Sequence, residues 1–179
     1  MITDTDFKII PRAELRESKL NPRHHFDPAA LAELTESVKA KGILQPLVVR
    51  QNGAGYELVA GARRYRAAKA AGLELIPCMV RDLTDVEVLE IMVIENGQLT
   101  DIHPLEEAQG YKQLMAMEKG GRKLDAAGIA ARVGRSVKYI YDRMKLCALI
   151  TEAKHLFMED KITAGHAILL ARLSAEEQK

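Results

Sequence analysis

The sequence predicts an α+β protein, with a mixed α/β N-terminal domain followed by an all-α domain. The first observation is that strand-like apolar runs stop near residue 82, after which apolar residues recur at helical spacing. The second is a reversal of charge within the helical part. Residues 82–118 contain nine acidic residues and one basic residue, whereas residues 122–145 contain seven basic and two acidic residues. We therefore predict domains at residues 1–82 and 83–179.

Composition excludes several classes of protein. The chain has 179 residues, of which 47% are hydrophobic and 28% are charged, so it can bury a core. It contains no apolar run long enough to span a bilayer and does not begin with a secretory signal pattern. Cys78 and Cys147 form no metal or redox motif, which predicts reduced thiols in a cytosolic protein.

The first predicted helix begins at Asp27, which is a good N-cap and is followed by a proline. Apolar residues from Leu31 to Val38 recur at helical spacing, and Gly42 ends the helix. Further along, we predict strands at 43–49, 56–60 and 75–81, a turn at 52–55, and an arginine-rich helix from Gly61 to about Gly72.

The rest of the chain is predicted to be helical. Pro104 lies near the start of one of these helices, and glycines at positions 120 and 121 mark its end. The predicted helices cover residues 85–96, 103–120, 125–133, 136–146, 151–160 and 163–173.

The arginine-rich helix begins unusually, in the stretch ELVAGARRYRAAKAAG. Arg63, Arg64 and Arg66 crowd its first turn, where the helix dipole is already positive and acidic residues are normally favoured. A glycine at position 61 lets the backbone approach an anion closely. The pattern predicts a phosphate site, and the alternative is a solvated basic face.

A second stretch, IENGQLTDIHPLEEA, is a candidate to complete this site. Glu95 and Asn96 offer a carboxylate and an amide, which beside an arginine cluster could hold Mg²⁺ and phosphates together. The alternative is a helix-ending asparagine beside an exposed glutamate. We expect residues 83–104 to complete the pocket of the N-terminal domain.

Residues 125–146 carry a helix-turn-helix pattern. Ala130, Gly134 and Ile140 occupy its small, turn and apolar positions, and such a motif places its second helix in the major groove of DNA. The alternative is a basic helical hairpin without a ligand. The predicted DNA contacts are Arg135, Ser136, Lys138, Tyr139, Asp142, Arg143 and Lys145.

Several motifs together resemble the ParB family of plasmid and chromosome partition proteins. NPRHHFD, GILQPLVVR, YELVAGARRYRAAKAAGL, ENGQLTDIHPLEEA and the helix-turn-helix occur in the family's order. The resemblance implies a ParB/sulfiredoxin-like N-terminal domain and a helical DNA-binding domain. It also implies a palindromic parS-like site, CTP with Mg²⁺, and a dimer that closes through its N-terminal domains into a clamp that spreads on DNA.

The resemblance also assigns residues by position. The family's arginine motif, which holds the triphosphate, falls on Gly61, Ala62, Arg63, Arg64 and Arg66. The strand entry that lines the nucleotide pocket falls on Ile43, Leu44, Gln45 and Pro46. The family's acidic-amide pair, which serves Mg²⁺ and hydrolysis, falls on Glu95 and Asn96.

The chain departs from the family pattern in four places. Ala62 replaces the usual glutamate, and Leu99 replaces a basic residue. Losing a carboxylate near the phosphates removes a group that could orient water or metal, so we expect CTP to be bound but hydrolysed slowly or not at all. The family's N-terminal arm for a ParA-type ATPase and its C-terminal dimerisation domain are not evident. This pattern is expected of a truncated or reduced member.

Two other functions are compatible with these motifs. One is a plasmid transcriptional repressor that uses the same helix-turn-helix. The other is a phosphoryl-transfer enzyme of the sulfiredoxin-like type, which a reactive cysteine at the phosphate turn would favour, but Cys78 lies in a predicted strand away from it. We expect a cytoplasmic protein associated with the nucleoid or a plasmid, with no membrane partner.

Overall fold

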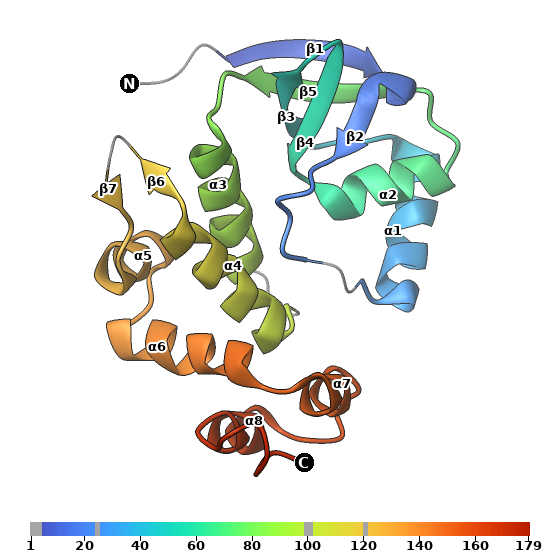
Figure 1. Cartoon of the computed structure of the whole chain (residues 1–179). Coiled ribbons are helices and arrows are strands. Elements are labelled where there is room, and N and C mark those ends of the chain that lie inside the picture. The colour runs from blue at the N-terminus through green and yellow to red at the C-terminus, as the bar shows by residue number, and fades with distance from the viewer. Residues whose placement is uncertain (1–4, 24–25, 99–101, 120–121) are drawn as a thin grey trace. The chain divides into compact units, whose positions relative to one another are not determined.

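The computed structural model describes residues 5–23, 26–98, 102–119 and 122–179 (Figure 1). The chain forms two compact units, Met1–Met92 (unit 1) and Val93–Lys179 (unit 2). Helix α3 (Asp85–Gln98) runs from the first unit into the second. The predicted α+β class is confirmed, because unit 1 contains a mixed sheet and the described part of unit 2 is helical apart from one short hairpin.

The sheet of unit 1 has five strands in the order β1-β5-β3-β4-β2. Strand β1 pairs antiparallel with β5, β5 pairs parallel with β3, β3 pairs antiparallel with β4, and β4 pairs parallel with β2. The strands are β1 (Thr5–Pro11), β2 (Leu15–Glu17), β3 (Leu47–Asn52), β4 (Gly55–Ala60) and β5 (Leu75–Arg81). Strands β1 and β2, joined by the short 3-10 helix η1 (Arg12–Glu14), were not predicted.

The predicted strand at 43–49 is wrong at both ends. Strand β3 begins only after Pro46, which lacks a backbone N–H and cannot donate to a sheet ladder. It then continues to Asn52, which pairs with Gly55 across a two-residue turn. Gly53 in that turn has φ of 62°, the left-handed conformation that hairpin turns require.

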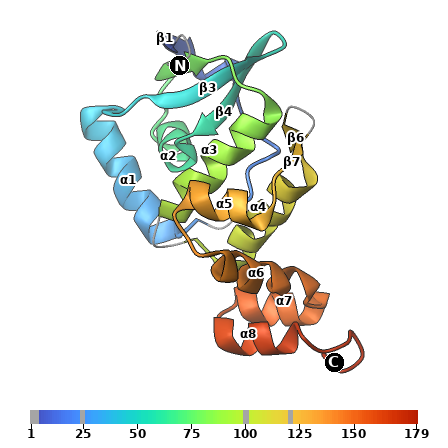
Figure 2. The ribbon, with the colours of Figure 1, turned by 90° about the vertical axis from the view of Figure 1, so that its left-hand side faces the viewer.

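Both faces of the central strands are buried. On one face, Leu47, Val49 and Leu58 pack in a core with helices α1 (Pro28–Lys41) and α2 (Ala62–Ala70) (Figure 2). On the other face, Val59 packs with Val88 and Met92 of α3. Because strand side chains alternate between faces, neighbours such as Leu58 and Val59 belong to different clusters. Strand β4 therefore has a continuous buried run rather than an alternating one.

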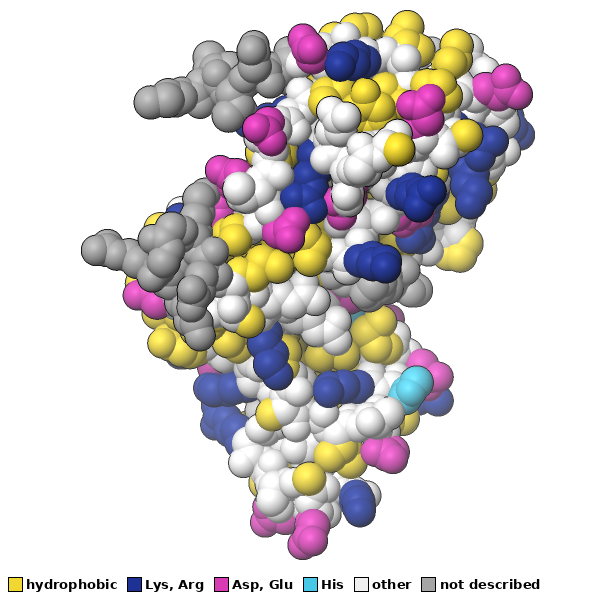
Figure 3. Space-filling view, turned by 45° about the horizontal axis from the view of Figure 1, so that its top comes forward, with side chains coloured by type: hydrophobic (Ala, Val, Ile, Leu, Met, Phe, Trp, Pro, Cys, Tyr) yellow, Lys and Arg dark blue, Asp and Glu magenta, His cyan; other side chains and the backbone are white. Residues whose placement is uncertain are grey.

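The outer strands are less covered. Phe7 and Ile9 of β1 and Leu75 of β5 are exposed, although the alternate residues Ile10 and Ile76 are buried. Apolar side chains are visible at the top of Figure 3, over this part of unit 1. The helices of unit 1 therefore cover the central strands more completely than the edge formed by β1.

Unit 2 is built from short helices. They are α4 (Pro104–Ala116), α5 (Ala126–Val133), α6 (Val137–Lys145), the 3-10 helix η2 (Leu146–Ala148), α7 (Thr151–Met158) and α8 (Ala164–Leu170). The prediction extended α4 to residue 120, which is wrong, because Met117 leaves the helical conformation and a hairpin of β6 (Glu118–Lys119) and β7 (Arg122–Lys123) follows. Within the described ranges, every helix is too short or too polar to cross a bilayer.

Candidate nucleotide and DNA sites

The predicted phosphate turn, Gly61–Arg66, joins β4 to α2. Gly61 caps the helix with φ of 95°, a conformation that costs a residue with a Cβ free energy. A Cβ on Gly61 would also lie 2.7 Å from Cδ2 of Leu47, so the buried Leu47 side chain would have to shift to admit one. Local backbone geometry and tertiary packing thus both require glycine at the point where the helix N-terminus begins.

Arg64 connects this turn to the predicted pocket-lining loop. Its Nη1 donates to the carbonyl oxygen of Gln45 at 2.5 Å and to that of Pro46 at 2.9 Å. The structure therefore brings the 43–46 loop and the arginine turn together, as the prediction of a shared site requires. Ile43 of the loop is half-buried against the core, whereas Leu44 is 79% exposed.

Arg66 is held by two contacts. It donates from Nε and Nη2 to the carboxylate of Glu17 in β2, with the shortest distance 2.8 Å. Its guanidinium carbon also lies 3.8 Å from the centre of the Phe26 ring, a cation–π distance. Arg63 and Ala62 are half-buried in the first turn of α2. An arriving phosphate would compete with Glu17 for Arg66.

Glu95 and Asn96 lie on α3 within unit 2, with Glu95 half-buried and Asn96 buried. They offer oxygen donors of the kind Mg²⁺ prefers. Among the described residues, no group of three or more His, Cys, Asp and Glu side chains could hold a metal. A magnesium ion here would therefore need further ligands, such as phosphate oxygens. Leu99 lies outside the described residues.

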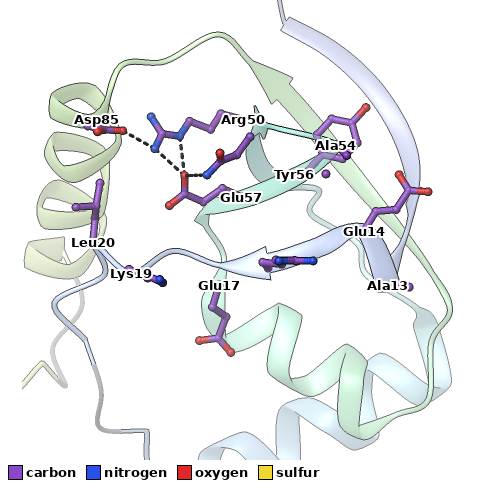
Figure 4. Close-up of a pocket in the computed structure, with 13 residues that line it drawn as sticks. Ala13, Glu14, Glu17, Lys19, Leu20, Arg50, Ala54, Tyr56, Glu57 and Asp85 are labelled. Carbon is purple, nitrogen blue, oxygen red and sulfur yellow. Dashed lines mark hydrogen bonds and ion pairs between the residues drawn. The ribbon is translucent and has the colours of Figure 1, made fainter.

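A cavity of about 900 Å³ in unit 1 lies elsewhere (Figure 4). Its lining comes from η1, β2 and the turn between β3 and β4, with Asp85 of α3, and includes none of the predicted nucleotide residues. Figure 4 shows Arg50 between Glu57 and Asp85, with Nη2 at 2.6 Å from Glu57 and 2.5 Å from Asp85.

Burial alone would lower the pKa of Arg50, but the hydrogen bonds that Arg50 donates to Glu57 and Asp85, together with their negative charges, outweigh it and raise that pKa. Sequence reasoning missed this cluster. The available signal was the position of Arg50 and Glu57 on either side of the hairpin turn, which makes them direct cross-strand partners.

The helix-turn-helix has the predicted packing. Ala130 and Ile140 are buried, and Gly134 ends α5 with φ of 67°. Asp125 caps α5 by accepting from the amide of Gly128, and Ser136 caps α6 by accepting from the amide of Tyr139. Capping side chains thus mark the starts of α5 and α6, and a glycine in the left-handed conformation marks the end of α5.

The seven predicted DNA contacts divide into three groups. Arg135, Ser136 and Lys138 are exposed at the start of α6. Asp142 and Lys145 pair with each other at 2.7 Å, and the hydrogen bond from Lys145 lowers the pKa of Asp142. Tyr139 and Arg143 instead contact Glu107 of α4.

Two other residues of α6 extend the exposed surface. Val137 is 41% exposed and Tyr141 is 54% exposed, although both are apolar enough to be buried if packing allowed. They lie one turn apart and hence on the same side of the helix as each other. The sequence analysis did not include these two residues, because it considered only polar and charged side chains as DNA contacts. Their apolar surface is suited to the methyl groups of thymine.

Comparisons with known proteins agree with this two-part organisation. Residues 2–97 match the family model described as the ParB N-terminal domain, and residues 100–179 match the ParB HTH domain. The chromosome-partitioning protein Spo0J of Thermus thermophilus is 44% identical over 169 residues, covering 94% of this chain and 61% of that protein. Stage 0 sporulation protein J of Bacillus subtilis is 44% identical over 163 residues, covering 90% of this chain and 56% of that protein. The chain thus spans little more than half the length of these relatives.

Solved structures give the same result. C-terminally truncated ParB from Caulobacter crescentus, complexed to the centromeric parS site, is 37% identical with a TM-score of 0.63, and the match covers 96% of both chains. The same protein complexed with CTP-gamma-S is 39% identical with a TM-score of 0.50, over 95% of this chain and 94% of that one. With both of its domains matched and relatives more than 40% identical along most of its length, the chain belongs to the ParB family.

Proposed function

We propose that this chain is a CTP-dependent clamp that binds a palindromic parS-like DNA site during plasmid or chromosome partition. One observation carries the proposal. The chain matches nearly the full length of a ParB fragment that has been crystallised with parS and with CTP-gamma-S. The packed helix-turn-helix supports the DNA part, and the glycine-arginine turn supports the nucleotide part.

The nucleotide would be held by the arginine turn and the 43–46 loop. The N-terminus of α2 supplies backbone N–H groups, and Arg63, Arg64 and Arg66 supply positive charge for the phosphates. Gln45 and Pro46 lie against Arg64 and would border the same ligand. Glu95 and Asn96 would hold Mg²⁺ together with phosphate oxygens, and the ion would offset phosphate charge.

The DNA part requires two copies of the chain. One helix-turn-helix reads one half-site, so a palindrome is matched by two-fold related copies. CTP would promote this self-association through the N-terminal domains and close the clamp. DNA binding would place the chain on the nucleoid or on a plasmid, and a ParA-type ATPase partner stays a prediction.

The first experiment is a calorimetric titration of CTP, ATP and GTP, each with Mg²⁺, into the wild type, Arg64→Ala and Lys69→Ala. Lys69 is an exposed cation in the last turn of the same helix, so it controls for a general loss of charge. We expect selective CTP binding that Arg64→Ala abolishes and Lys69→Ala retains. Equal binding of all three nucleotides, or none, would remove CTP from the proposal.

The DNA part is tested separately by binding to a parS duplex and to a scrambled duplex of the same length. We expect preference for parS, and loss of that preference when both half-sites are changed. Failure here with intact CTP binding would leave a nucleotide-binding protein without parS recognition.

A further inference from the structure

Three side chains of unit 2 contact the buried carboxylate of Glu107. It lies on α4 and its residue is 6% exposed. The hydroxyl of Tyr111 donates to it at 2.6 Å and that of Tyr139 at 2.9 Å, and Nε of Arg143 forms an ion pair with it at 2.9 Å. A buried carboxylate is costly unless such partners compensate it, so the cluster is held together by the charge at its centre.

Two of these donors come from the predicted DNA-reading helix. Tyr139 and Arg143 are four residues apart on α6 and therefore share one side of it. Nε of Arg143 also donates to the Tyr139 hydroxyl at 3.1 Å, so the two side chains form one network with Glu107. The apolar contact of Ile140 between them is not directional, whereas these hydrogen bonds are. The network therefore fixes how far α6 is rotated about its own axis.

The network also reaches the exposed start of α6. The guanidinium carbons of Arg135 and Arg143 lie 5.3 Å and 4.8 Å from the centre of the Tyr139 ring. Arg135 is exposed and directly precedes the helix cap at Ser136. Tyr139 therefore contacts both Arg143 within α6 and the exposed Arg135 that precedes the helix.

We infer that Glu107 is a positioning residue for DNA recognition, acting through Tyr139 and Arg143 rather than touching DNA itself. The inference rests on the proposed DNA binding. Reading bases depends on hydrogen bonds of fixed geometry, whereas phosphate contacts carry no sequence information. Rotation of α6 should therefore weaken discrimination between sites more than general affinity for DNA.

The test compares two substitutions that remove the same chemical group. Tyr139→Phe and Tyr111→Phe each remove one hydroxyl that donates to Glu107. Tyr139 links α4 to α6, whereas Tyr111 lies on α4 four residues after Glu107 and links α4 only to itself. Both variants keep the ring, so both keep its packing. If the Glu107 carboxylate only stabilised unit 2, the two variants would change the discrimination between DNA sites to the same extent.

The first measurement is the ratio of dissociation constants for a scrambled duplex and a palindromic parS duplex, taken over a series of salt concentrations. We expect Tyr139→Phe to lower this ratio about tenfold, the effect of losing a hydrogen bond to a charged group. We expect Tyr111→Phe to change it less than about twofold. The salt slope should stay at the wild-type value in both variants, because no phosphate contact is removed.

The second measurement needs no DNA. Backbone amide exchange in residues 137–145 should speed up in Tyr139→Phe and not in Tyr111→Phe, while residues 126–133 of α5 keep their protection in both. A wild type that shows no preference for parS would refute the proposed function, and the exchange result would still decide the inference about α6. Equal changes in the two variants, or no change in either, would overturn the inference.

Discussion

At the scale of single residues, the arginine turn depends on a glycine, because a side chain at position 61 would be strained and would crowd Leu47. Gly61 and Gly72 lie at the two ends of α2, and both have positive φ, 95° and 75°. They differ in surroundings, because a Cβ at Gly61 would meet Leu47 at 2.7 Å, whereas a Cβ at Gly72 would meet nothing within 4 Å. An alanine at position 72 would therefore cost only the strain of the left-handed backbone, whereas an alanine at position 61 would also cost the overlap with Leu47.

We predict that Gly72→Ala lowers the free energy of unfolding by about 1 kcal/mol, the cost of placing a Cβ in the left-handed region. Gly61→Ala should lower it by at least about 1 kcal/mol more, because Leu47 must also move. Urea denaturation of the two variants and the wild type checks this. Equal losses of unfolding free energy in the two variants would show that the overlap with Leu47 does not affect stability.

Ala62 raises a question about chemistry at the same turn. It occupies the position where the resemblance places a glutamate, beside the arginines that would hold phosphates. We predict that the wild type releases phosphate from CTP slowly even with parS DNA, and that Ala62→Glu speeds the release at least several-fold, since a carboxylate can orient water. Phosphate release assays check this, with Ala62→Gln as the uncharged control. Fast release by the wild type would contradict it.

At the scale of elements, the β3–β4 hairpin is tied to the start of α3 by charge. Arg50 donates to Glu57 across the hairpin and to the carbonyl oxygen of Leu83, and it pairs with Asp85. Asn52 also donates to Glu57 at 3.1 Å. Arg50 and Glu57 are both largely buried, so the ion pair between them compensates each charge for its loss of contact with water.

We predict that Glu57→Gln lowers the free energy of unfolding by about 2 kcal/mol, because it removes the charge that Arg50 and Asn52 donate to. Glu36→Gln should lower it by less than about 0.5 kcal/mol, since Glu36 pairs with Lys39 on an exposed face of α1. Denaturation of both variants in low salt gives the comparison. Similar losses in the two would show that burial of the Arg50–Glu57 pair adds nothing.

At the scale of the whole molecule, each compact unit contains one cysteine. Cys78 is buried in the core of unit 1, and Cys147 lies half-buried in unit 2. Burial raises the pKa of the Cys78 thiol to about 11 from its ordinary value of 9.0. The folded state therefore holds the proton of the Cys78 thiol more tightly than the unfolded chain does.

The sign of the resulting pH dependence follows from that difference. Below about pH 9 both states keep the proton and the stabilisation is complete. As pH rises from 9 towards 11 the unfolded chain loses its proton first, so stability falls by on the order of 2 kcal/mol. Cys78→Ala should show a smaller fall over this window. Identical pH profiles for the variant and the wild type would contradict the prediction.

Local sequence patterns were enough to predict the existence and order of helices α1 to α8, of the central strands β3 to β5, and of the helix-turn-helix. Gly42, Gly61 and Gly134 mark helix boundaries because their positive φ is a local property of the backbone, and Asp27, Asp125 and Ser136 mark helix starts because capping is equally local. The arginine turn was also predicted, and the resemblance assigned the 43–46 loop to the same pocket. The hydrogen bonds from Arg64 to that loop were not predicted.

The direction in which particular side chains point could not be predicted from the sequence. A polar face drawn along α6 counts Tyr139 and Arg143 with Lys138, but the first two contact Glu107, which lies more than thirty residues earlier in the chain. In the same way, strands β1 and β2 became strands by pairing with β5 and β4. Contacts of this kind join segments distant in sequence, so no local pattern contains the information that specifies them.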